Sequence, residues 1–298
     1  MENIKSQDFK RYVVAILFLC LLLVGCSRES EPLLPMEVSV FGLGRADSIL
    51  ITTENHAVMI DTGKNRHGED IVNYLLSQNI TSLDYLIITH FDRDHVGGAH
   101  HIIDAIDVQT VIVPNYSRES RHVSRLNRAM ADANLTAFVL TEPLRLTLDG
   151  AEFIVDPTLK PYFAFGTRND NPQELDGDNF SIVVSITHGD NAFLFTGDAR
   201  SRRMREILRN GDLMRIDFDF LKIPRHGRHM SRSDEFIETV SPRYAVITDS
   251  YEDPAQEELL DILDAIDAQV FFARQNGVRA TSDGIEITVV YEDFFELE

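Results

Sequence analysis

The sequence predicts an α/β protein built as a four-layer αββα sandwich, in which two β-sheets pack face to face between outer helices. Short apolar runs of strand length dominate residues 36–155, and strands alternate with helical patterns after residue 179. The 298 residues are 44% hydrophobic, which is enough for one large core. No repeat and no linker follows residue 36, so residues 37–298 are expected to form a single domain.

The first half of the chain is rich in strand patterns. Residues 68–79 carry apolar side chains at Ile71, Val72, Leu75 and Leu76, which is the spacing of one helix face. Residues 99–106 and the arginine-rich residues 117–134 are also expected to be helical. The expected strands cover residues 36–44, 47–53, 56–63, 83–90, 110–114, 137–140, 144–148 and 151–155.

The second half mixes strands and helices. Residues 158–178 lack periodicity and contain Pro, Gly, Asn and Asp, so we expect a long loop. A hairpin over residues 179–198 follows, with turn residues at positions 189–191. The expected helices cover residues 200–210, 233–240 and 255–266, and the expected strands cover residues 218–224, 244–250, 269–273 and 284–290.

The first 25 residues predict a lipoprotein signal peptide. Basic residues precede an apolar run over residues 12–24, which is shorter than the about 20 residues that a membrane-spanning helix needs. The run ends in LVGC, which resembles a bacterial lipobox, so Cys26 is the expected lipidation site. Residues 26–36 then form a tether. The sequence therefore predicts an exported bacterial lipoprotein, anchored on the extracytoplasmic side of a membrane; an ordinary cleaved signal or a short anchor is the alternative.

Composition limits the chemistry of the body. Both cysteines, Cys20 and Cys26, lie in or directly after the signal segment, so a metal in the body must use His, Asp or Glu. The net charge of −20 disfavours non-specific binding to nucleic acid. Residues 200–232 nevertheless contain ten basic residues against four acidic ones, which marks a local basic region. Nothing in the sequence indicates a protein partner.

The turn after the strand at residues 83–90 carries the strongest chemical signal. It reads THFDRDHVGG and places His90, Asp92, Asp94 and His95 within six residues. Imidazole nitrogen and carboxylate oxygen are ligands for zinc, manganese or iron. The alternative is an Asp-rich helix cap, but a cap needs one Asp or Ser rather than this cluster.

This turn resembles the His-x-His-x-Asp-His signature of the metallo-β-lactamase fold superfamily, with Asp92 at the second histidine position. That variant resembles the metallohydrolase domain of ComEC-type competence DNA-uptake proteins. The resemblance extends over nearly the whole body. It is carried by GLGRADSILI (42–51), MIDTG (59–63), NFSIVV (179–184), FLFTGD (193–198) and LKIPRHGRHMS (221–231).

The resemblance implies a dinuclear metal centre, with zinc expected and manganese as the alternative. His90 and Asp92 would hold the first ion, and Asn179 stands where the family has a third histidine. Asp94 and His95 would hold the second ion, and Asp94 would also orient the nucleophile. The remaining implied residues are Asp198 as the bridging carboxylate, His226 as a ligand of the second ion, and Asp61 as a hydrogen-bond partner of a liganding imidazole.

Arginines beside the implied ligands indicate the substrate class. Arg225 and Arg228 flank His226, and a guanidinium fork suits phosphate oxygens. We therefore expect an anionic phosphoester or phosphodiester substrate, such as a nucleic acid, a nucleotide or an envelope component, cleaved by a metal-dependent hydrolase. Two alternatives stay open. One is an inactive relative that serves in binding or assembly, favoured by Asn179 and Arg225, and the other is an amide hydrolase of the β-lactamase type.

Overall fold

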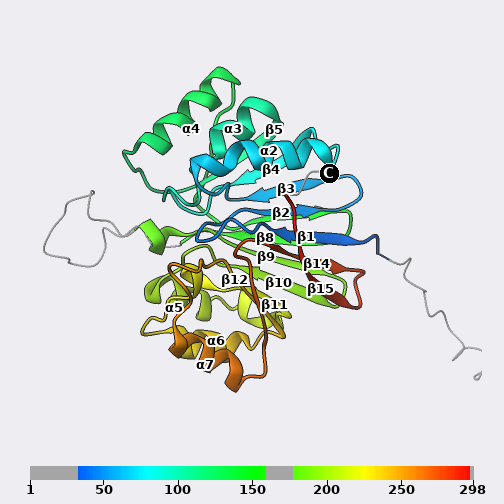
Figure 1. Ribbon diagram of the computed structural model, residues 1–298, viewed down its shortest axis with the longest axis vertical. Coiled ribbons are helices and arrows are strands. Elements are labelled where there is room, and N and C mark those ends of the chain that lie inside the picture. The colour runs from blue at the N-terminus through cyan, green and yellow to red at the C-terminus, as the bar shows by residue number, and fades with distance from the viewer. Residues whose placement is uncertain (1–32, 159–176, 296–298) are drawn as a thin grey trace, which may run out of the picture. The chain divides into compact units, whose positions relative to one another are not determined.

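Two β-sheets lie face to face in the computed structural model, which describes residues 33–158 and 177–295 (Figure 1). In spatial order, the first sheet contains β15 (Ile287–Glu292), β14 (Gly277–Ser282), β1 (Met36–Val40), β2 (Ile49–Thr52), β3 (Ala57–Ile60), β4 (Ser82–Ile87), β5 (Asp107–Pro114) and β6 (Phe138–Leu140). The second contains β13 (Gln269–Phe272), β12 (Tyr244–Ile247), β11 (Phe220–Lys222), β10 (Asn191–Phe195), β9 (Val183–His188), β8 (Ala151–Asp156) and β7 (Leu144–Leu148).

Side chains from both sheets interdigitate in the central core. Val38 and Val40 of β1 belong to the same buried core as Phe153 of β8 and Phe193 and Phe195 of β10. The intervening residues of β10 belong to the opposite, outer core, as the two-residue period of a strand requires. Because β10 is buried on both faces, its sequence is apolar almost throughout rather than alternating.

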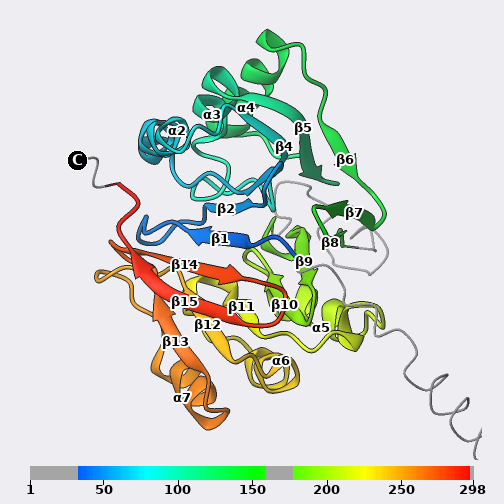
Figure 2. The same ribbon diagram turned by 90° about the vertical axis from the view of Figure 1, so that its right-hand side faces the viewer.

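Helices cover the outer face of each sheet (Figures 1 and 2). The first sheet packs against α2 (Gly68–Ser77), α3 (Ala99–Ala105) and α4 (Arg121–Asp132), and the second against α5 (Ser201–Leu208), α6 (Ser233–Val240) and α7 (Glu257–Ala265). The apolar face expected for residues 68–79 is confirmed for Ile71, Val72 and Leu75, which are buried, whereas Leu76 is 45% exposed. The four-layer αββα prediction is therefore confirmed.

Parallel strand pairs set the position of the functional groups. In the first sheet β3, β4 and β5 run parallel, and in the second β10, β11 and β12 do so. In α/β folds, ligands bind beyond the carboxyl ends of such strands. Asp61 and His90 follow β3 and β4, while Asp198 and His226 follow β10 and β11.

The structure differs from the expected elements at two places. Strand β14 lies between β1 and β15, yet its GVRATS sequence was not expected to be a strand, because Arg, Ala and Ser weaken the β signal. Asn179 was expected in a hairpin strand, but it lies in the 3₁₀ turn η4 (Gly177–Phe180), and the strand begins at Val183.

Some expectations fall outside the described residues. The lipoprotein signal over residues 1–25, the lipidation site Cys26 and most of the expected loop at 158–178 belong to this group. Within residues 33–158 and 177–295, no helix combines the length and apolarity that crossing a membrane requires.

Candidate metal centre

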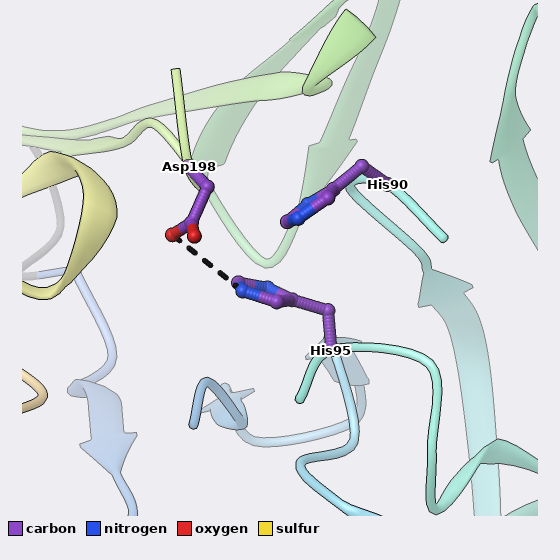
Figure 3. A group of neighbouring side chains, drawn as sticks. All are labelled: His90, His95 and Asp198. Atoms are coloured by element: carbon purple, nitrogen blue, oxygen red, sulfur yellow. Dashed lines mark ion pairs between the residues drawn. The ribbon is translucent and has the colours of Figure 1, made fainter. Parts of the chain in front are cut away.

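Asp198 lies at the centre of a group of histidines contributed by both sheets. Its Oδ1 is 3.5 Å from His95 Nε2, and its Oδ2 is 3.5 Å from His226 Nε2. Figure 3 shows the imidazoles of His90 and His95 directed toward this carboxylate. Asp94 joins from the other side, with Oδ2 3.9 Å from His226 Nε2. Asp198 thus directs one oxygen to each of these two imidazoles.

The converging atoms have no hydrogen-bond partners among the described residues. They are Nε2 of His90, His95 and His226, together with Oδ1 of Asp198, and all are buried. Buried polar atoms are rarely left unpaired, because desolvation without a new bond costs about 1–3 kcal/mol for each group. Several unpaired lone pairs that point into one small space fit a divalent cation, which accepts them all.

The opposite ring nitrogens are held by outer partners. His95 Nδ1 lies 2.7 Å from Asp61 Oδ2, and His226 Nδ1 lies 2.9 Å from the carbonyl oxygen of Thr248. These acceptors fix a proton on Nδ1 and leave Nε2 as the donor toward a metal. Asp61 also accepts bonds from the backbone N–H and the hydroxyl of Thr89, at 2.8 and 2.6 Å, and so links two strand ends.

The pKa values of the converging histidines and of Asp198 are shifted by burial and by their charged neighbours. Burial, reinforced by neighbouring His95, lowers the pKa of His90 to about 4, so the imidazole is neutral at pH 7. Burial would lower the pKa of His95 too, but the carboxylates of Asp61 and Asp198 outweigh it and raise that pKa well above its ordinary value. Burial would raise the pKa of Asp198, yet His226 and His95 hold it well below the usual range. His95 would therefore release a proton when a metal binds.

Comparison with known proteins identifies the family. Residues 41–247, more than half of the chain, match the model of the Metallo-beta-lactamase superfamily. The chain belongs to the metallo-β-lactamase superfamily. It is 25% identical over 263 residues to ComE operon protein 3 of Bacillus subtilis (strain 168), a match that covers 81% of this chain and 32% of that protein. It is 26% identical over 238 residues to Recombination protein 2 of Haemophilus influenzae, covering 78% and 26% respectively.

Both relatives are much longer than the matched region, so the chain spans about a third or less of each. Competence protein ComA of Neisseria gonorrhoeae is similar over a comparable share. The crystal structure of the metallo-β-lactamase fold protein YhfI from Bacillus subtilis aligns with a TM-score of 0.52 at 12% identity, over 81% of this chain and 97% of that one. That alignment supports the fold.

Two carboxylates lie beside His90 in this candidate centre. Donor atoms of His90, Asp92 and Asp178 all lie within 4.8 Å of one another. Asn179, the expected ligand, directs its Oδ1 to the backbone N–H of Arg203 at 3.3 Å. The structure therefore favours Asp178 over Asn179 beside His90.

The two predicted substrate arginines have carboxylate partners. Arg225 Nη2 lies 3.1 Å from Asp178 Oδ2, inside the centre. Arg228 is exposed and donates to Asp253 at 3.1 Å, and Arg45 binds the same carboxylate. Arg228 therefore belongs to a surface ion-pair cluster, and its role in substrate binding stays a prediction.

Sequence reasoning missed the buried pair of Lys222 and Asp47. Both side chains are almost completely buried, and Lys222 Nζ forms an ion pair with Asp47 Oδ2. Asp47 Oδ1 accepts a 2.6 Å bond from the hydroxyl of Thr248, which also contacts His226. In the sequence Lys222 resembles an ordinary lysine at the end of a strand. Its position four residues before His226 was the signal that could have placed it near the candidate centre.

Gly97 lets the turn at residues 89–98 pack closely against its neighbours. A Cβ at this position would lie 2.2 Å from the carbonyl oxygen of Arg93 and 2.7 Å from the backbone nitrogen of Asn65. Gly97→Ala is therefore expected to lower the free energy of unfolding by about 1–3 kcal/mol. Urea denaturation measures this, with Gly211→Ala as the control, because nothing lies within 4 Å of a Cβ there. Equal stability of the two variants would contradict the close packing.

Proposed function

We propose that the protein is a metal-dependent hydrolase that cleaves a phosphoester or phosphodiester, exported and anchored to a membrane through Cys26. The observation that carries the proposal is the convergence of His90, His95, Asp198 and His226, whose inward-facing atoms include several without partners among the described residues. Membership of the metallo-β-lactamase superfamily adds to it. Export and anchoring rest on the N-terminal sequence alone.

The side chains have separable roles in such a reaction. Asp198, His95, His226 and Asp94 would hold one ion, and Asp198 would share the other with His90. Two divalent ions bound there would lower the pKa of a bridging water and polarise the phosphoryl oxygen. Asp94, with Oδ2 3.9 Å from His226 Nε2, would orient that nucleophile. Burial would raise its pKa, but His95 and His226 lower it, which keeps the carboxylate ionised.

Basic groups beside the centre favour an anionic substrate. Burial lowers the pKa of Lys64, nearby Asp94 opposes this, and the positive charges of Arg66 and Arg93 add to the lowering. In a chain of net charge −20, a local group of cations would attract an anionic substrate. A phosphate ester carries that charge at neutral pH, whereas a neutral amide does not.

The test combines metal analysis with two chromogenic substrates. We expect about two metal ions per chain, hydrolysis of bis-p-nitrophenyl phosphate that EDTA abolishes, and no hydrolysis of nitrocefin. Cleavage of nitrocefin alone would instead identify an amide hydrolase. A metal-free protein that cleaves neither substrate would support an inactive binding protein, in which Arg225 and Arg118 neutralise Asp178 and Asp92.

A further inference from the structure

We propose that Asp178 is the third ligand of the first metal position, and that Arg225 is the residue that positions its carboxylate. The inference rests on the metal centre of the proposed function. It departs from the resemblance, which puts the ligand one residue later at Asn179. Metal binding and catalysis can be measured separately, so the assignment can be tested without knowing the substrate.

The geometry around His90 supports Asp178 as a ligand. Asp178 Oδ1 is 3.8 Å from His90 Nε2, and Asp92 completes a set of donors within 4.8 Å. Two donors bound to one zinc at about 2.0–2.2 Å lie roughly 3.3 Å apart in a tetrahedral site. The His90–Asp178 pair at 3.8 Å therefore needs a closure of about 0.5 Å to share one ion.

The two oxygens of Asp178 face different partners. Oδ1 faces His90, while Oδ2 is 3.1 Å from Arg225 Nη2. The side chain of Asp178 is only 9% exposed, so its charge needs a nearby cation. Liganding carboxylates are usually held by a hydrogen bond on the atom that does not face the metal. Arg225 would therefore orient Asp178 in the way that Asp61 orients His95, through the atom that faces away from the metal position.

Asn179 serves a different purpose in this structure. Its amide oxygen accepts a bond from the backbone N–H of Arg203, in the first turn of α5. The buried guanidinium of Arg203 donates to the carbonyl oxygens of Ser181 at 3.0 Å and Asp156 at 2.7 Å. These bonds fasten η4 to the second sheet and to α5. With Asn179 turned toward the helix, its neighbour Asp178 is left to face the metal position.

The backbone of η6 (Pro224–Gly227) directs Arg225 to its place. Arg225 has φ 51° and ψ 39°, and His226 has φ 56° and ψ 31°. Non-glycine residues rarely adopt this left-handed conformation, which costs about 1–3 kcal/mol for each residue. Two such residues in succession send Arg225 to Asp178 and His226 to Asp198, so the turn serves both metal positions.

The first experiment compares metal stoichiometry in matched neighbours. After loading with Zn²⁺ and dialysis, we expect about two ions per chain for the parent protein and for Asn179→Ala, and about one for Asp178→Ala. Asp178→His, which restores an imidazole donor, should return the value to about two. Retention of two ions by Asp178→Ala, or loss of one by Asn179→Ala, would overturn the assignment. Circular dichroism monitors folding, and the isosteric Asp178→Asn replaces any variant that does not fold.

The second experiment measures how tightly the weaker ion is held, by competition with a chromophoric chelator. Arg225→Met should weaken that ion by about 10- to 100-fold, and Arg225→Lys should recover part of the loss. Arg228→Met is the control and should leave both affinities unchanged. Unchanged affinities in Arg225→Met would refute the positioning role.

These measurements separate the inference from the proposed function. A parent protein that binds two ions but cleaves no phosphoester would refute the function and leave the role of Asp178 testable by stoichiometry. A parent protein that binds fewer than two ions would refute the assignment of Asp178 itself.

Discussion

Asp94→Ala is expected to abolish metal-dependent phosphoester hydrolysis, with a loss of about 10³-fold or more in kcat/KM. The side chain lies 3.9 Å from His226 Nε2 and is held ionised by His95 and His226. Its removal would take away a proposed ligand of the second ion and the group proposed to orient the nucleophile. Several kcal/mol of transition-state stabilisation are then lost, and each 1.36 kcal/mol is a tenfold change in rate. Steady-state kinetics with bis-p-nitrophenyl phosphate measure the effect.

His122→Ala is the matched control for this prediction. His122 lies on α4, among Arg121, Arg125 and Arg93, and belongs to none of the candidate metal groups found among the described residues. Its removal should leave kcat/KM within a factor of about two, as expected for a change that touches no reacting group. If Asp94→Ala and His122→Ala kept equal activity, the turn at residues 89–98 would not be part of the catalytic centre.

Lys222→Met is expected to lower the free energy of unfolding by about 3–5 kcal/mol, because it leaves the Asp47 carboxylate buried without its cation. Burial would raise the pKa of Asp47, but Lys222 and the nearby histidines lower it, so the carboxylate stays charged in the folded protein. Lys222 Nζ also donates to the carbonyl oxygen of Gly197 at 3.3 Å, directly before Asp198. Urea denaturation of the metal-free protein measures the change.

Two further variants separate the charge effect from general damage to the core. Asp47→Asn combined with Lys222→Met removes both charges and should recover most of the lost stability, since neutral replacement of a buried pair is often tolerated. Arg145→Ala breaks the exposed ion pair with Asp212 and should cost less than about 1 kcal/mol. A Lys222→Met variant as stable as Arg145→Ala would mean that the buried pair is unimportant for folding.

The architecture was largely predictable, because burial imposes periodicity on the sequence. Strands with apolar runs, such as β4 and β10, and helices with a clear apolar face, such as α2, follow from local pattern. Strand β14 escaped prediction because its stability comes from pairing with β1 and β15 on both edges rather than from its own residues. Such non-local pairing leaves little trace in a single segment.

The candidate metal centre could be predicted where one motif contains several donor side chains. It could not be predicted where the orientation of a single residue determines which neighbour it contacts. His90, Asp94 and His95 lie in one turn, and Asp198 and His226 follow strand ends. The choice between Asp178 and Asn179 depends on the rotation of a 3₁₀ turn, which the sequence does not encode in any periodic pattern. Arg228 likewise pairs with Asp253, a partner 25 residues away that no motif linked to it.

The division of the donors between the two sheets has a mechanical consequence. His90 and His95 belong to the first half of the fold, and Asp198 and His226 to the second. Cations bound between the two sheets would hold their strand ends together. They would raise the free energy of unfolding by RT ln(1 + [L]/Kd), where [L] is the concentration of free metal ion. Chelation of the metal should then increase amide hydrogen exchange at the strand ends of both sheets together, rather than in one sheet alone.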